Sequence, residues 1–286
     1  MSGGVFAKFV GCTLSIGVAL PVAALASPSV AWASPIDRYG VVRIVGQRQP
    51  LRLATSTSNN WFGYNKGALE PGNGPFSSIS ASWRVPRARQ RVRGQAEQSA
   101  TWIGIGGGCV DTACVLTDAS GLIQAGTEQD VMRSGRPRYS AWWELVPLPA
   151  VTISRMHVRP GDRMHAAVFE VQPVLGLWRV TLKDLTRRET FTKTVPYASS
   201  RASAEWIEET PLTLGTSGAG FAALPRLDRT SFSSATVNGH GAGLRPSERV
   251  RLRAGSRVIG TPSLPEEHGR GFVACSWTSR CPVRAR

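Results

Sequence analysis

The chain has 286 residues, and 34 lysines and arginines against 19 aspartates and glutamates give it a net charge of +15. It contains no low-complexity tract, no internal repeat and no long apolar stripe with helical spacing, which excludes fibrous, repeat and all-helical classes. Its 30 glycines and 19 prolines instead interrupt the sequence at short intervals, a pattern typical of all-β proteins.

Residues 1–33 are predicted to be an export signal. A lysine precedes an apolar stretch from Phe9 to Ala26, and Ala31-Trp32-Ala33 fits a cleavage site. Ala24-Leu25-Ala26 is a second candidate site, and an uncleaved anchor is the alternative. Because Pro21 interrupts the apolar run, a full membrane-spanning helix is disfavoured. We therefore expect a secreted, extracellular protein.

Residues 34–58 form a basic, irregular segment that we interpret as a pro-segment or a flexible leader. Removal of the signal leaves 253 residues (286 − 33), enough for one large β domain or two small ones. We expect one folded domain over residues 59–286, beginning at Asn59-Asn60-Trp61.

Short strand candidates follow one another through this domain, separated by turn signals such as Pro71-Gly72-Asn73-Gly74. Regular short strands with this punctuation predict a β-sandwich or a barrel. The expected strands are Phe76–Val85, Gln98–Ile105, Gly121–Gly126, Tyr139–Leu145, Arg163–Val171, Leu177–Asp184, Glu189–Val195, Ala202–Glu208 and Ser231–Asn238.

Four cysteines remain once the signal is removed, and an even number in an exported chain indicates disulfides. Three pairings of Cys109, Cys114, Cys275 and Cys281 are possible. The local pairs Cys109–Cys114 and Cys275–Cys281 are the simplest, since each closes a short loop. A zinc site is the rival interpretation, but the spacing is not that of a zinc motif and we expect no metal.

Gln124 and Glu205 are polar residues inside segments that otherwise read as strand. A polar group on a strand face is tolerated where that face is wet or where the group is paired. An amide and a carboxylate in one cleft could stabilise an oxyanion and activate water. Trp142 and Glu144 share a strand face, and such a mixture of aromatic and acidic groups suits a groove that holds an extended polymer.

Other catalytic patterns are weaker. The sequence around Ser217 fails the nucleophile-elbow pattern, and the four histidines lack metalloprotease spacing. Gly104–Gly108 lacks the strand–helix context of a nucleotide loop, so we interpret it as a tight loop leading into Cys109. The positive charge favours anionic surfaces as partners or serves solubility, and we expect no specific nucleic-acid binding.

Seven short stretches follow one another in the chain: Asn60–Gly63, Phe76–Pro86, Ser99–Ile105, Leu122–Gly126, Tyr139–Glu144, Gly161-Asp162 and Ser203–Ile207. They cover roughly residues 59 to 238. In this order, they resemble the glutamic peptidases of the eqolisin (G1) family.

The resemblance implies an antiparallel sandwich of two large sheets, with the lectin-like architecture of the concanavalin type. It implies that Gln124 and Glu205 are the catalytic pair on the concave sheet. The cleft positions of the family correspond to Trp61, Trp102, Trp142 and Glu144. The usual Gln-Thr-Gly reads Gln124-Ala125-Gly126 here, and where an aspartate commonly follows, this chain has Thr127-Glu128, so we assign Glu128 to the cleft.

The expected activity is therefore acid endopeptidase chemistry on a polypeptide substrate. Glu205 would act as the general base on water, and Gln124 would donate to the oxyanion, without a cofactor or a covalent intermediate. We expect a monomer. The alternatives are a lectin-like carbohydrate-binding protein and a glycosidase that pairs Glu205 with Glu144.

Overall fold

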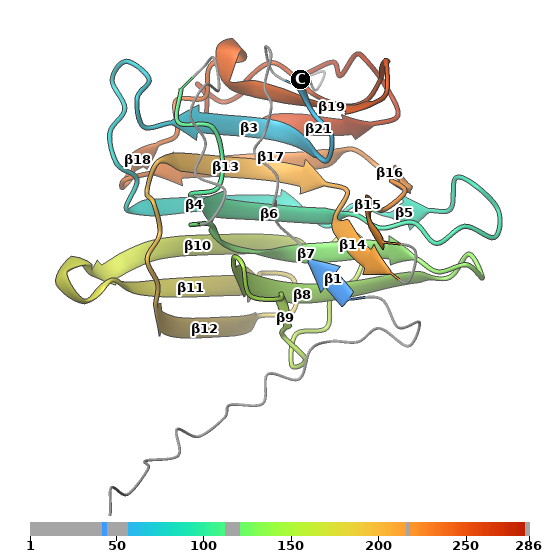
Figure 1. Cartoon of the computed structure of the whole chain (residues 1–286), viewed down its shortest axis with the longest axis horizontal. Helices are drawn as coiled ribbons and strands as arrows, with labels where there is room; N and C mark the ends of the chain where they lie inside the picture. The colour runs from blue at the N-terminus through green and yellow to red at the C-terminus, as the bar shows by residue number, and fades with distance from the viewer. Residues whose placement is uncertain (1–41, 45–56, 112–120, 216–217, 284–286) are drawn as a thin grey trace, which may run out of the picture. The chain divides into compact units, whose positions relative to one another are not determined.

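A computed structural model describes residues 42–44, 57–111, 121–215 and 218–283 (Figure 1). The chain divides after Ala33, and all the described residues belong to the second unit, Ser34–Arg286. Apart from strands, the described part contains two short 3-10 turns, η1 (Pro173–Leu175) and η2 (Pro246–Glu248). None of its helical turns has the length and apolar character needed to cross a membrane.

Fourteen strands form one continuous path of hydrogen-bonded neighbours that folds over into two halves. The back half contains, in spatial order, β12 (Glu189–Pro196), β11 (Leu177–Asp184), β10 (Arg163–Gln172), β4 (Ser78–Arg84), β17 (Thr230–Val237), β21 (Phe272–Ser276) and β20 (Arg257–Pro262). The front half continues with β19 (Arg249–Ala254), β3 (Trp61–Gly67), β13 (Ser203–Glu209), β6 (Ala100–Ile105), β7 (Ile123–Val131), β8 (Pro137–Leu145) and β9 (Val151–Thr152).

Seven short strands lie outside this path. They are β2 (Thr57–Ser58) on β19, β18 (His240–Gly241) on β17, the pair β5 (Ala88–Arg89) and β16 (Arg226–Leu227), and a small sheet of β1 (Val42–Ile44), β14 (Leu212–Gly215) and β15 (Gly218–Phe221). The pairing of β2 with β19 is parallel, and the pairings between the main strands are antiparallel.

The predicted fold class, an antiparallel β-sandwich, is confirmed. Apolar side chains from both halves share one buried core, as Ile103 and Ile123 of the front half do with Trp83, Val168 and Leu182 of the back half. In β4 and β11 these residues alternate with polar, more exposed ones, so burial of one face explains the strand period and the pairing register there. Strands β6 and β7 are buried on both faces. The strand predicted at Leu177–Asp184 is observed with the same bounds, and the others shift by a few residues.

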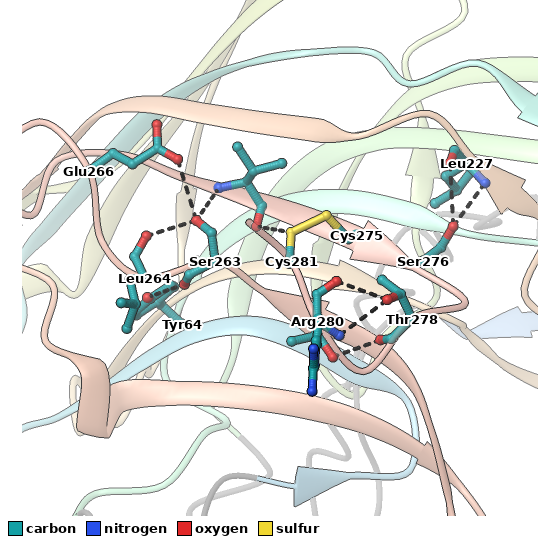
Figure 2. Close-up of a disulfide and its surroundings, with 12 residues drawn as sticks. Tyr64, Leu227, Ser263, Leu264, Glu266, Cys275, Ser276, Thr278, Arg280 and Cys281 are labelled. Atoms are coloured by element: carbon teal, nitrogen blue, oxygen red, sulfur yellow. Dashed lines mark hydrogen bonds between the residues drawn. A yellow bond between two sulfur atoms is a disulfide. The ribbon is translucent and has the colours of Figure 1, made fainter. Parts of the chain in front are cut away.

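The C-terminal part of the chain, for which the sequence suggested no assignment, provides the connection between the two halves. Strands β19, β20 and β21 run from β3 of the front half to β17 of the back half. Beside β21, the predicted disulfide Cys275–Cys281 is present (Figure 2). Ser263 fastens the same region, because its carbonyl accepts from Tyr64 at 2.7 Å and its hydroxyl accepts from the Val273 amide at 3.0 Å.

Candidate active site

Five residues on neighbouring strands of the front half form one row across the sheet. In spatial order they are Asn65, Glu205, Gly104, Gln124 and Glu144. Residues directly opposite one another in antiparallel strands share a face, so all five project to the same side. Two strand spacings, about 10 Å, separate the backbones of Glu205 and Gln124. The two residues are 81 positions apart in the chain (205 − 124), and the pairing of β13, β6 and β7 brings them into one row.

The remaining predicted site residues lie in the next two rows of the same face. One row contains Trp102 and Trp142, with Gly126 between them. The following row contains Trp61 opposite Glu209, and Glu128 opposite Ala100. The sheet therefore brings together all seven of the predicted catalytic and substrate-binding residues, Trp61, Trp102, Gln124, Glu128, Trp142, Glu144 and Glu205.

Gly104 keeps the space between the catalytic candidates open at the level of the backbone. A Cβ at this position would lie 2.7 Å from a methyl carbon of Leu122 and 3.1 Å from the Cβ of Gln124. The first contact would require the Leu122 methyl group to shift, and the second is tight, so a side chain here would press on both Leu122 and Gln124. A glycine at this point of the row thus leaves no side chain on β6 between Glu205 on β13 and Gln124 on β7.

Glu144 orients the amide of Gln124. The Nε2 atom of Gln124 donates to Oε2 of Glu144 at 2.5 Å, and both side chains are fully buried. This contact assigns the nitrogen and oxygen of the amide, because a carboxylate accepts from the NH₂ group and not from the oxygen. One N–H of Gln124 is held by Glu144, and the second hydrogen of the same NH₂ group is directed elsewhere.

Glu205 lies in an enclosed, weakly polar environment. Its side chain is fully buried, and neither carboxylate oxygen has a hydrogen-bond partner of ordinary geometry among the described residues. Burial raises the pKa of Glu205 well above its ordinary value, and the neighbouring Ser203 hydroxyl opposes this shift only in part. Desolvation of the charged form is the physical cause. A buried carboxyl that lacks partners costs stability, which favours a functional over a structural role.

The glycine-rich loop after β6 covers this carboxyl. A Cβ on Gly108 would lie 2.4 Å from Oε1 of Glu205 and 2.0 Å from Oδ1 of Asn65, so the loop backbone packs directly on both side chains. Asn65 fixes the loop by donating to the Cys109 carbonyl at 3.0 Å and accepting from its amide at 3.2 Å. The sequence predicted only a tight loop here, and its position over Glu205 was missed.

Cys109, at the end of this loop, is disulfide-bonded. The predicted partner, Cys114, lies outside the described residues, so the predicted pairing Cys109–Cys114 stays a prediction.

The three tryptophans belong to a second apolar cluster on the site face, separate from the main core. Trp61 and Trp102 meet edge to face, with ring centroids 5.0 Å apart. The Trp102 indole N–H donates to Oε2 of Glu209 at 2.8 Å, and the Asn60 amide donates to Oε1 of Glu209 at 3.1 Å. Glu209 therefore fixes Trp102. The sequence reasoning missed Glu209 because it ended the strand at Glu208, and one more residue of the same alternation would have found it.

Glu128 lies on the site face, two rows from Gln124, and accepts a hydrogen bond from Ser140 at 2.7 Å. Its side chain is almost fully buried. The position suits a residue that contacts an extended ligand away from the Glu205–Gln124 row.

Glu208 is a second buried carboxyl that the sequence reasoning did not single out. It projects to the inner face of β13, where Thr101 and Thr230 donate to its Oε2 at 2.7 and 3.0 Å. Burial raises the pKa of Glu208 to about 8, the two hydroxyls oppose that shift, and the charge of Glu209 adds to it. Its place between the sheets keeps it away from any ligand on the site face.

Metal ligands do not gather at this site. Within the part of the chain that the structure describes, no three histidine, cysteine, aspartate or glutamate side chains are grouped as they would be around a metal ion.

Comparisons with known proteins identify the family and the fold. A family model described as the Peptidase A4 family matches residues 59–264, so that β21 lies beyond the matched segment. A comparison with curated protein sequences found no match.

Several solved structures have the same fold. A scytalido-glutamic peptidase bound to a transition-state analogue inhibitor superposes with a TM-score of 0.59 at 19% identity, covering 77% of this chain and 98% of that one. SCP-B, an eqolisin in complex with the tripeptide Ala-Ile-His, gives a TM-score of 0.55 at 19% identity with the same coverage. The aspergilloglutamic peptidase of Aspergillus niger gives 0.50 at 22% identity, covering 63% of this chain and 99% of that one.

Proposed function

The chain belongs to the Peptidase A4 family, and from this premise we propose that it is a secreted glutamic endopeptidase in which Glu205 and Gln124 act on water and a peptide carbonyl. One observation carries the proposal. In the cross-strand row, Gly104 lies between Glu205 and Gln124, so no side chain separates them there. Glu144 accepts a hydrogen bond from the amide nitrogen of Gln124 and thereby fixes the orientation of the amide.

In the first step, ionised Glu205 takes a proton from a water molecule as the oxygen of that water attacks the peptide carbonyl carbon. The electron pair of the C=O bond moves to the carbonyl oxygen. The second N–H of the Gln124 amide would donate to this oxyanion, an interaction worth about 3 kcal/mol. Glu144 supports this role because it sets which end of the amide faces the substrate.

In the second step, the carbon–nitrogen bond breaks, and Glu205 passes its proton to the leaving nitrogen. The products are a carboxylic acid and an amine, and Glu205 returns to the ionised form. Because burial raises the pKa of Glu205, the base is ionised only at a higher pH than an exposed carboxyl would be. Once protonated, Glu205 also retains its proton more strongly than an exposed carboxyl would, until the proton is transferred to the leaving nitrogen. We propose that the acid limb of the pH–rate profile lies above the ordinary glutamate range.

The enclosure of Glu205 also requires that substrate and water gain access. The leader strand β1 pairs with β14, which begins three residues after the end of β13, the strand that carries Glu205. We propose that the leader is removed during export and that the mature N-terminus lies between Ser34 and about Asn60. N-terminal sequencing of secreted protein tests this, and a sequence that begins at Met1 would contradict it.

The activity is tested by incubating the protein with a denatured protein substrate between about pH 3 and pH 7. Parallel reactions contain pepstatin, a metal chelator or neither. We expect cleavage at internal peptide bonds that neither reagent prevents. Loss of cleavage with the chelator would contradict the metal-independent mechanism, and loss with pepstatin would indicate aspartic peptidase chemistry. No proteolysis combined with retention on a glycan column would instead support the lectin-like alternative.

A further inference from the structure

The outer face of the back half carries a strip of cations along β10 and β11. Cross-strand pairing places Arg163 beside Arg84, His165 beside Lys183, and Phe169 beside Arg179. These residues project away from the core, because the residues that alternate with them, such as Met164, Val168 and Leu182, belong to the buried cluster. We call this set, Arg84, Arg163, His165, Lys183 and Arg179, the basic strip.

None of the four lysine or arginine members of the basic strip forms an ion pair with a described residue. Arg84 donates to the Gly161 carbonyl at 3.2 Å, and Arg179 donates to the Thr194 hydroxyl at 3.2 Å. Arg187, at the nearby hairpin turn, contrasts with them, since it meets the carboxylates of Asp162 and Asp184. The strip therefore has positive charge that no carboxylate among the described residues neutralises in an ion pair.

The carboxylates of the same strands are all directed elsewhere. Asp184 pairs with Met164 on the inner face, and Glu189 pairs with Asp184. Glu170 forms an ion pair with Arg201. The carboxylates of β10, β11 and β12 thus lie off the outer face, and an anionic partner would meet none on the outer face of these strands. One cation, Lys193 opposite Val180, lies on the inner face and is not part of the strip.

Hydroxyl groups fill the space around the cations. One full row between Lys183 and Arg179 reads Thr192, Thr181, Ala167, Ser80 and Thr236 across five neighbouring strands. Strand rows repeat every two residues, about 6.6 Å, and neighbouring strands are about 4.8 Å apart. The surface therefore presents short hydroxyl side chains between the cations, and the spacing of both is set by the regular geometry of the sheet.

We propose that the basic strip binds an acidic linear polysaccharide, whose regularly spaced carboxylates contact the cations and whose hydroxyls contact the serines and threonines. A polysaccharide fits better than single-stranded nucleic acid, because base stacking needs open aromatic rings. Among the described residues of β10 and β11 that project to this face, Phe169 is the one phenylalanine, tyrosine or tryptophan, and the Arg179 guanidinium covers it with 5.6 Å between guanidinium carbon and ring centroid.

The strip and the candidate active site lie on opposite outer faces of the sandwich, with the shared core between them. A polysaccharide on the back half would leave the row of Glu205 and Gln124 accessible to a polypeptide. The protein would thus be retained on an anionic polymer while it acts. The binding does not depend on the proposed catalytic chemistry.

The test compares two triple variants of the full chain, R163S/R179S/K183S in the basic strip and R93S/R133S/R136S elsewhere. Each removes three positive charges, and the control arginines are exposed residues outside the strip and the candidate site. Binding to polygalacturonate is measured at low salt, with neutral dextran as the uncharged reference. We expect the strip variant to bind at least about 10-fold more weakly and the control variant to change by less than about threefold.

Equal weakening in both variants would overturn the proposal, because it would show a diffuse effect of net charge. Absence of polygalacturonate binding by the unmodified protein would overturn it as well. Duplex DNA and anionic lipid vesicles are tested in parallel, the latter because η1 exposes Val174 and Leu175 beside the strip. Tighter binding to either than to polygalacturonate would replace the proposed partner. Unchanged thermal unfolding of both variants shows that they remain folded.

Discussion

The two faces of β13 carry carboxylates that are equally buried and differently partnered. Glu205, on the site face, is fully buried without a hydrogen-bond partner of ordinary geometry among the described residues. Glu208, on the inner face, is also fully buried, but it accepts from Thr101 and Thr230. Burial raises the pKa of both groups.

The comparison shows that burial and a raised pKa do not by themselves identify a catalytic group. Glu208 has both properties, but it lies between the sheets among hydroxyls, where no substrate can meet it. Glu205 combines them with an unsatisfied carboxylate and with an oriented amide in the same row. The alignment with Gln124, rather than the titration behaviour, distinguishes the site from a buried structural acid.

The largest expected effect separates these two acids. Glu205→Gln keeps the shape of the side chain but removes the base, so we expect turnover to fall by about 1,000-fold or more. Glu208→Gln preserves the acceptor for Thr101 and Thr230, and we expect its turnover to stay within about threefold of the unmodified protein. Steady-state cleavage of a peptide substrate measures both.

Thermal unfolding serves as the control for this pair, since both variants must remain folded. A folded Glu205→Gln protein with near-normal proteolysis would end the assignment of Glu205 as the base. An equal loss of turnover in folded Glu208→Gln would contradict the distinction between the two faces.

A smaller effect is expected at the amide. Gln124→Ala keeps the base but removes the donor to the oxyanion, so we expect kcat to fall by about 100-fold. Glu144→Gln keeps an amide oxygen that can accept from Gln124 but loses the charge that strengthens this contact and fixes which end of the Gln124 amide it meets, so we expect a loss of about 10-fold in kcat with little change in KM. A glycosidase would need Glu144 as much as Glu205, so equal losses in the two glutamate variants would favour that alternative.

Much of the site was predictable because successive side chains of a strand point to alternate faces of the sheet. Gln124 and Glu205 interrupt apolar segments, and Trp142 and Glu144 share a face by their spacing. These patterns, together with the family resemblance, predicted the set of residues that the sheet brings onto one face. The order of strands β13, β6, β7 and β8 could not follow from alternation alone, since pairing depends on contacts between distant parts of the chain.

Three features of the structure could not be predicted from the sequence, each for a physical reason. Glu209 was missed because strand ends are the least certain part of a pattern. The packing of Gly108 on Glu205 depends on how a loop returns to the sheet, and loop geometry has no simple periodic signal. The joining of the two halves by β19, β20 and β21 depends on edge pairing, to which the sequence of the C-terminal part gives no clear guide.

The comparison also predicts how stability varies with pH. The folded protein binds the Glu208 proton more tightly than the unfolded chain, because burial raises the pKa from 4.5 to about 8. The contribution of this group to stability is full below about pH 4.5 and is lost progressively as the pH rises to about 8. Over that interval one such group lowers the free energy of unfolding by about 1.4 kcal/mol per pH unit.

Glu208→Gln removes this titration. The free energy of unfolding of the variant should therefore decline less steeply between about pH 4.5 and pH 8 than that of the unmodified protein. Denaturant unfolding at several pH values measures the difference between the two slopes. Glu205→Gln should also flatten the decline, since burial raises the pKa of Glu205 in the same direction. Parallel slopes for the unmodified protein and Glu208→Gln would show that Glu208 is already ionised in the folded state.

The smallest expected effect concerns the third carboxylate of β13, Glu209, which fixes Trp102 on the site face. Glu209→Gln can still accept from the Trp102 indole or from the Asn60 amide, but without its charge it holds both less firmly. Because neither partner is placed next to the reacting atoms, we expect KM to rise about threefold to tenfold with kcat nearly unchanged. Steady-state kinetics with a peptide long enough to reach Trp102 measures this division, and a control peptide truncated on that side should show no difference between the two proteins. A fall in kcat as large as that of Gln124→Ala would instead place Glu209 among the groups that act on the reacting bond.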